Sequence, residues 1–126
     1  MGNMGSFEDL LVWQKAHCFV LNVYKVTASF PREELFGLTS QFRRAAVSIA
    51  ANIAEGYKKK GVKDKLRFYN TSQGSLEECK YYLILSQDLN YAKTDNLRAD
   101  IDEIGKMLES YMKTMRENSD SLTSNS

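Results

Sequence analysis

Apolar residues recur at intervals of three and four along most of the chain, which is the period of one buried helical face. Comparable runs occur within residues 10–28, 38–60, 64–89 and 94–117. The clearest run belongs to the last of these segments and consists of Leu97, Ile101, Ile104, Leu108, Tyr111 and Met115. The pattern therefore predicts four helices of similar length.

Local signals at the ends of these segments support the four helices. The spacing after Ser6 predicts a capping box in which its side chain bonds the amide of Asp9. Pro31 ends the first helix because its ring disfavours helical geometry at the preceding residue. Gly61 is expected as a left-handed cap after the second helix. Gly74, inside the third helix, indicates either a close contact with another helix or chance, since glycine costs a helix about 1 kcal/mol.

Length and composition fit one helical domain. The chain has 126 residues, enough for a single core, and its seven glycines and one proline are too few for the turns of an all-β fold. Four helices with short connections favour an all-α, up-and-down antiparallel bundle over residues 1–117. Residues 118–126 have almost nothing to bury and are predicted to form a disordered polar tail.

The sequence also predicts a cytoplasmic protein. No apolar run is long enough for a membrane span, and Glu8 and Asp9 stand where a signal peptide would carry its apolar stretch. Cys18 and Cys79 fit no metal-ligand spacing. They are expected to be buried thiols in a reducing compartment.

The first predicted helix has too little charge for a surface helix. Only two of the nineteen residues 10–28 are charged, so an outer apolar face would remain exposed in a single copy. Scattered surface hydrophobes are one interpretation. We favour self-association into a homo-oligomer, because contiguous apolar and aromatic area is typical of interfaces. The predicted interface residues are Trp13, Phe19, Val20, Tyr24, Tyr81 and Tyr82.

A basic segment between the second and third helices is the sharpest charge feature. The net charge is only +1, yet residues 56–67 contain six basic side chains against Asp64 alone. Such a segment binds phosphate backbones in some proteins and is a solvated corner in others. The candidate nucleic-acid-binding residues are Arg43, Lys58, Lys59, Lys60, Lys63, Lys65 and Arg67.

Polar side chains also follow one stripe of the second helix, at Arg44, Ser48, Asn52 and Glu55. They could form a surface that contacts a ligand or RNA. We favour a structural polar seam whose donors and acceptors satisfy one another and set the helix register. Arg43 projects about 100° from Arg44 on the helix and is expected to be the arginine that reaches solvent or a partner.

No catalytic constellation is recognisable. His17 is the only histidine and has no carboxylate at useful spacing. Glu77 and Glu78 lack a histidine three residues later, so the Glu-x-x-His pattern of di-iron bundles is absent. Phosphate-binding glycine loops are also missing. The sequence predicts a protein that is not an enzyme and has no metal or cofactor.

Several motifs, in order along residues 7–108, resemble the family of 23S ribosomal RNA intervening-sequence proteins. They read FEDL at 7–10, VWQ at 12–14, FPxxExFGL at 30–38, QFRRAAVSI at 41–49, NIAEG at 52–56 and GSLxE at 74–78. The resemblance implies an antiparallel bundle that assembles as a ring-shaped homopentamer without an established activity. A similar fold is used by the accessory variability proteins of diversity-generating retroelements, which hold a reverse transcriptase and its RNA.

These observations together predict a non-enzymatic oligomeric bundle that binds RNA or an RNA–protein complex through its basic segment. The alternative is a protein-assembly scaffold, such as a retroelement accessory subunit that docks a reverse transcriptase.

Overall fold

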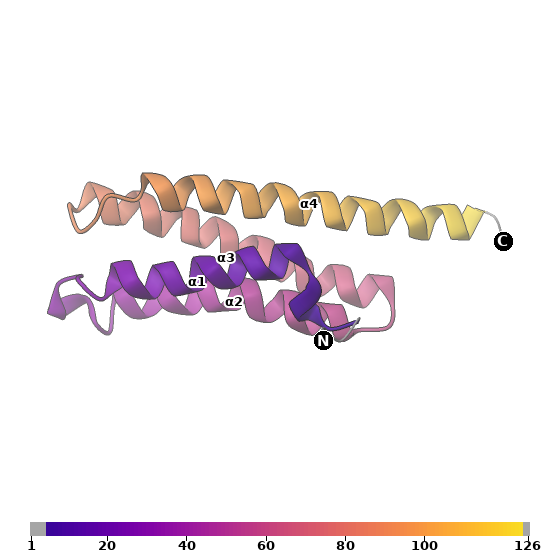
Figure 1. Ribbon diagram of the computed structural model, residues 1–126, viewed down its shortest axis with the longest axis horizontal. Helices are drawn as coiled ribbons and strands as arrows, with labels where there is room; N and C mark the ends of the chain where they lie inside the picture. Colours follow the sequence, from indigo (N-terminus) through magenta and orange to yellow (C-terminus); the bar gives the residue numbers. More distant parts are fainter. Residues whose placement is uncertain (1–4, 125–126) are drawn as a thin grey trace.

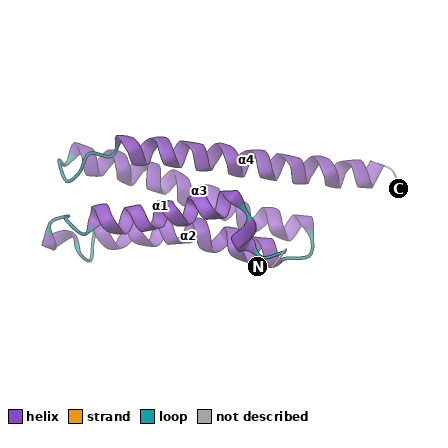
Figure 2. Cartoon of the chain, in the orientation of Figure 1, coloured by secondary structure: helices purple, strands orange, loops and turns teal. Residues whose placement is uncertain are grey.

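The computed structural model describes residues 5–124, with side chains as far as residue 119. Four α-helices form most of it, namely α1 (Leu11–Thr27), α2 (Leu38–Lys58), α3 (Val62–Asp88) and α4 (Asp95–Ser124) (Figures 1 and 2). Short 3-10 helices, η1 (Phe7–Asp9) and η2 (Arg32–Glu34), precede α1 and α2. Residues 5–124 contain no strand, so the predicted all-α class is confirmed.

The helices run up and down in a four-helix bundle (Figure 1). Each packs against two neighbours: α2 lies between α1 and α3, and α4 lies between α3 and α1. Short connections force this antiparallel order, because a chain of a few residues can only return beside the helix it leaves. The α2–α3 pair has the most extensive contact, which the small residues of α2 permit.

One shared core lies between the four helices. Phe42, Ile49 and Ile53 of α2 and Ile104 and Leu108 of α4 are almost completely buried. Burial of each large apolar side chain contributes about 1.5–3 kcal/mol. The faces predicted for these two helices are therefore the faces that they bury.

The buried face of α1 largely follows the spacing of three and four residues. Ala16, Val20, Val23 and Thr27 are buried, whereas Leu10 and Trp13, which lie on the same stripe, are only half-buried. Val12 and Phe19, beside the stripe, are buried as well. Apolar residues surround this helix almost completely, and packing against α2 and α4 selects those that reach the core.

Two helix-end signals differ from their predictions. The amide of Glu8, not Asp9, donates to the Ser6 side chain at 3.2 Å, because residues 7–9 form a tighter 3-10 turn. Gly61 is extended, with φ −84°, and precedes α3 rather than capping α2 in a left-handed conformation. The left-handed residue is Asn90, with φ 60°, directly after α3, and asparagine tolerates this region better than most residues.

Glu34 links the two connections at one end of the bundle. Its Oε1 accepts the amide of Leu38 at 3.2 Å, and its Oε2 accepts the hydroxyl of Tyr91 at 2.9 Å. The latter bond raises the pKa of Tyr91. A Cβ at Gly37 would lie 2.9 Å from Glu34 Oε1, so glycine keeps this space open. One carboxylate therefore caps α2 and contacts the α3–α4 connection.

The close helix approach expected at Gly74 occurs at Gly56 instead. A Cβ at Gly56 would lie 2.6 Å from a ring carbon of Tyr69 and 3.0 Å from Cβ of Phe68. A Cβ at Gly74 would meet nothing within 4 Å. Gly56 therefore allows the last turns of α2 to pack directly on α3, and Gly74 has no packing role within one copy.

The last helix extends beyond its predicted end. Residues 118–124, expected in a disordered tail, continue α4 to Ser124, so that prediction is wrong for these residues. The hydrogen-bonded ladder of a helix can propagate past its packed part without further burial. Residues 125–126, and residues 1–4 at the other terminus, lie outside the described part of the chain.

Candidate nucleic-acid interface

The basic segment folds into one corner of the bundle, where α2 ends and α3 begins. Lys58 is the last residue of α2, Lys59 and Lys60 lie in the connection, and the remaining cations lie in the first turns of α3. We call this set the basic corner: Lys58, Lys59, Lys60, Lys63, Lys65 and Arg67. The short connection between α2 and α3 places these residues at the end of that hairpin (Figure 1).

Lys65 is used by the fold itself. Its ammonium donates to the backbone carbonyl of Tyr57, lies 3.4 Å from the carbonyl of Gly56 and stands 5.2 Å from the Tyr57 ring centroid. Both carbonyls belong to the last turn of α2, and that of Gly56 also accepts the amide of Lys59 at 3.2 Å. Partial burial lowers the pKa of Lys65. The side chain is therefore a helix cap more than a free binding group.

Two further cations of the corner lie against one aromatic ring. Lys59 Nζ is 5.0 Å and the Arg67 guanidinium 5.1 Å from the ring centroid of Phe68. Arg67 also contacts Asp64, with 3.4 Å between Nη2 and Oδ1. Both charged ends remain near solvent, because cation–π contacts of this kind leave one side of the cation open.

Lys58, Lys60 and Lys63 remain available. All three are exposed, and none forms an ion pair with any residue that the structure describes. Elsewhere, by contrast, Lys15 contacts Glu103 of α4 at 2.7 Å. The basic corner thus carries positive charge that the protomer does not neutralise.

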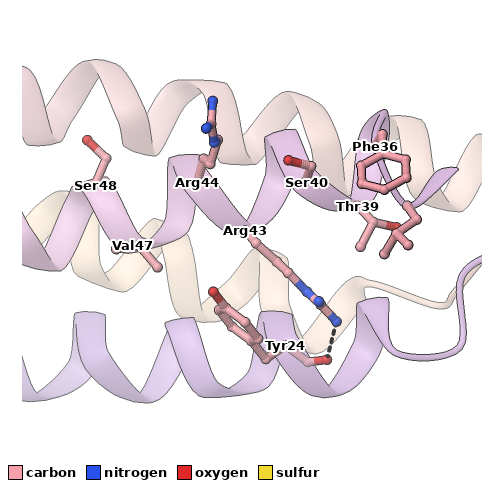
Figure 3. A pocket seen from close by; sticks show the side chains of 9 residues that line it. Tyr24, Phe36, Thr39, Ser40, Arg43, Arg44, Val47 and Ser48 are labelled. Carbon is pink, nitrogen blue, oxygen red and sulfur yellow. Dashed lines mark hydrogen bonds between the residues drawn. The ribbon is translucent and has the colours of Figure 1, made fainter.

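Arg43 and Arg44 exchange their predicted roles. The Nε of Arg43 donates to Thr27 Oγ1 at 2.8 Å, its Nη2 lies 3.4 Å from the Tyr24 carbonyl, and its guanidinium stacks 4.6 Å from the Tyr24 ring centroid. Arg44 is exposed and points to the opposite side of α2 (Figure 3). Arg43 also lies roughly 22 Å along α2 from Lys58, at 1.5 Å per residue, so it is not part of the basic corner.

The middle of the predicted polar seam exists as a hydrogen-bonded group. The Asn52 amide donates to the Ser48 carbonyl at 2.8 Å and to Ser48 Oγ at 3.0 Å, and Ser75 of α3 donates to Ser48 Oγ at 2.8 Å. Arg44 and Glu55, at the ends of the stripe, are exposed and make no hydrogen bond or ion pair with the described residues. The satisfied serine–asparagine group fixes the register of α2 against α3.

A shallow groove of about 630 Å³ lies at the other end of α2, between α1, the connection that precedes α2 and the outer side of α2 (Figure 3). Phe36 is 91% exposed, and Leu35 and Val47 are also largely open to solvent. Arg43 and Arg44 line its polar sides. We call it the apolar groove, and its lining residues are Tyr24, Leu35, Phe36, Thr39, Ser40, Arg43, Arg44, Val47 and Ser48.

The predicted subunit-interface residues differ in their burial within one copy. Phe19 and Val20 are buried in the protomer, at 1% and 8% exposure, so their assignment to a subunit boundary is wrong. Tyr24 and Tyr81 are exposed. Tyr82 is half-buried against Phe42, with 5.7 Å between ring centroids. The exposed groove residue Phe36 could have been identified from the sequence by its place in a short connection.

Trp13, the remaining predicted interface residue, is half-buried between two other rings. Its ring stacks on the His17 imidazole at 5.1 Å and meets the edge of Phe7 at 5.0 Å.

Chemistry-bearing side chains elsewhere are dispersed. Among the described residues no group of three His, Cys, Asp or Glu is arranged to hold a metal ion. Cys79 is buried, and its surroundings raise the pKa of the thiol to about 12, whereas Cys18 is exposed, contrary to the prediction. None of the helices in the described part has an apolar stretch that would span a bilayer.

The fold and the corner define a small four-helix bundle with a cationic end. Residues 8–110 match the family described as 23S rRNA-intervening sequence protein, and the chain belongs to this family, as its motifs predicted. A similar crystal structure is that of a protein with unknown function from the S23 ribosomal protein family of Bacteroides thetaiotaomicron VPI-5482. It has a TM-score of 0.74 and 26% identity, and the match covers 82% of this chain and 99% of that chain. No curated protein matches the chain.

Proposed function

We propose that this protein binds RNA through the basic corner. The observation that carries the proposal is the group of exposed ammonium ions at Lys58, Lys60 and Lys63, which have no carboxylate partner among the described residues. Phosphate groups would replace the counterions of these side chains, and release of counterions favours binding. The family description, which refers to an intervening sequence of 23S rRNA, supports RNA as the ligand.

The distribution of charge supports the same proposal. Residues 94–120 contain four basic and seven acidic side chains, so the balance of α4 is negative while the corner is positive. An RNA approaching such a molecule is steered toward the corner. Binding should therefore weaken as salt concentration increases, with a slope set by the number of phosphates neutralised.

A charge reversal with a matched control tests this function. The triple substitution Lys58→Glu, Lys59→Glu, Lys60→Glu should abolish binding of a short single-stranded RNA in a fluorescence anisotropy titration. The control reverses three exposed cations outside the corner, Lys25, Lys93 and Arg98, and changes the net charge equally. It should retain most of the affinity.

Two outcomes would contradict RNA binding at this corner. If the wild-type protein binds no RNA at low salt, the function is wrong. If both triple variants lose affinity equally, only overall charge matters and the corner is not the site.

A scaffold is the second candidate function, because the apolar groove presents Phe36 and Val47 to solvent beside Arg44. We propose that apolar surfaces of this kind join copies into a homo-oligomeric ring, a pentamer according to the family resemblance, that docks a partner such as a reverse transcriptase.

Light scattering should give a multimeric mass at micromolar concentration, and Phe36→Asp should lower it. A monomeric wild-type protein would exclude the ring. A partner that stays bound to the Lys58, Lys59, Lys60 charge-reversal variant would favour the scaffold over RNA binding.

A further inference from the structure

A second groove, between the start of α3 and the later turns of α4, adjoins the basic corner. It has a volume of about 450 Å³, and we call it the α3–α4 groove. Three cations from two helices line it: Lys63 and Arg67 from α3, and Arg116 from α4. The side-chain amide of Asn70 adds a hydrogen-bond donor to the same groove. This arrangement joins α4 to a corner that the sequence placed on α2 and α3 alone.

The floor and walls of this groove suit an anion. Met112, which is 1% exposed, closes the floor with apolar atoms, and a low-dielectric surface strengthens charge interactions above it. Arginine can bind a phosphate with two parallel N–H donors. The groove therefore offers planar, directional donors, whereas the exposed lysines of the corner offer point charges.

Two carboxylates hold the arginines of the groove weakly: Asp64, which itself lines the groove, and Glu109. Asp64 Oδ1 is 3.4 Å from Arg67, and Glu109 Oε1 is 3.6 Å from Arg116. Each pair is a single long contact between side chains that are 48–70% exposed. Exposed ion pairs of this kind contribute little to stability, so both guanidinium groups can turn toward a phosphate without a large loss.

Aromatic side chains near the groove are already engaged. Lys59 and Arg67 lie over Phe68, Lys65 lies over Tyr57, and Tyr69 is fully buried. Base recognition in single strands requires open aromatic faces on which bases stack. The contacts at this end of the molecule therefore favour the sugar–phosphate backbone over the bases.

We infer that the α3–α4 groove is a phosphate-binding site for the RNA backbone, in which Arg116 of α4 binds a phosphodiester together with Lys63 and Arg67. The inference rests on the proposed function and extends it, because it names the chemical group that is recognised and makes recognition independent of base sequence. Arg116 lies in an acidic helix, which is why sequence charge alone did not identify it.

The test compares Arg116→Gln with Arg98→Gln. Both arginines are exposed and lie on α4, but Arg98 is at the opposite end of the helix. Arg116→Gln should weaken binding of single-stranded RNA by about 3- to 10-fold and lower the salt slope by about 0.7, the value for one phosphate. Arg98→Gln should change neither. Homopolymers of different bases should bind the wild-type protein with similar affinity.

A titration with inorganic pyrophosphate separates this inference from the proposed function. It should shift the NMR signal of the Arg116 side-chain Nε–H and leave that of Arg98 in place. Absence of that shift, or an Arg116→Gln variant whose RNA affinity and salt slope equal those of Arg98→Gln, would overturn the inference. Failure of the wild-type protein to bind RNA would instead overturn the proposed function.

Discussion

At its N-terminal end α2 places Arg43 against α1, whereas at its C-terminal end it leads into lysines that stay in solvent. Arg43 bonds Thr27 and approaches the Tyr24 carbonyl, both in the last turns of α1. Lys65 contacts the carbonyls of Gly56 and Tyr57 in the last turn of α2. In both places one cation lies against the C-terminal turn of a helix, where positive charge is favourable.

The difference between the two ends is the number of cations left over. One arginine contacts the end of α1 and one lysine the end of α2, whereas Lys58, Lys60 and Lys63 remain exposed. The comparison shows that a basic residue near a helix end is a candidate for binding only after the cap has been assigned. The following predictions test this distinction.

The largest effect on stability is expected at Gly56, where the last turns of α2 pack on α3. Gly56→Ala should destabilise the protein by about 1–3 kcal/mol, because the added methyl would overlap the Tyr69 ring and overpacked sites relax incompletely. Gly74→Ala is the matched control. Since its methyl would meet nothing within 4 Å, it should stabilise the protein by about 0.5–1 kcal/mol through helix propensity. Urea denaturation measures both, and equal effects would contradict the packing described here.

An intermediate effect is expected from a comparison of the two kinds of cation. Arg43→Gln should cost about 1–2 kcal/mol, because it removes a charged hydrogen bond and a cation–π contact. Lys60→Gln should change the free energy of unfolding by less than about 0.5 kcal/mol, as is usual for exposed positions. If Lys60→Gln were as costly as Arg43→Gln, the lysines would be structural and the contrast between the two ends would fail.

The smallest effect is expected in alkaline solution. Tyr82 donates a hydrogen bond to Glu78 at 2.6 Å, and this bond raises the pKa of Tyr82 from 10.0 to about 12. The folded state therefore keeps this proton longer than the unfolded state, and the associated stability is lost as pH increases from about 10 to about 12. Tyr82→Phe should flatten that decline in urea midpoints, and the tyrosinate absorbance of this variant should show one late-titrating residue fewer than that of the wild-type protein. An unchanged pH profile would show that the Glu78 bond is absent in solution.

The pH dependence of stability that is due to Lys65, at the C-terminal end of α2, should have the opposite sign. Burial lowers its pKa from 10.5, so the unfolded state holds the proton longer and stability increases with pH in the window just below 10.5. Lys65→Met should remove that increase, whereas the exposed Lys58→Met should not.

Periodicity was sufficient to predict four helices and the buried faces of α2 and α4, because each of these helices has only one apolar side. It did not show that Val12 and Phe19 of α1 are also buried, because apolar residues lie on all sides of this helix and tertiary packing selects among them. Periodicity also could not predict the close contact between α2 and α3, since the need for glycine at Gly56 depends on where Tyr69 lies. Local charge density located the basic corner but could not tell the capping residue Lys65 from its exposed neighbours.

The bond from Tyr91 to Glu34 makes the two halves of the chain interdependent. Glu34 belongs to the α1–α2 hairpin and Tyr91 to the α3–α4 hairpin, so the hairpins cannot separate without removing the acceptor of the Tyr91 hydroxyl. We therefore expect amide exchange to report a single cooperative opening of both hairpins, so that a chain cut between them would yield fragments that are stable only when recombined.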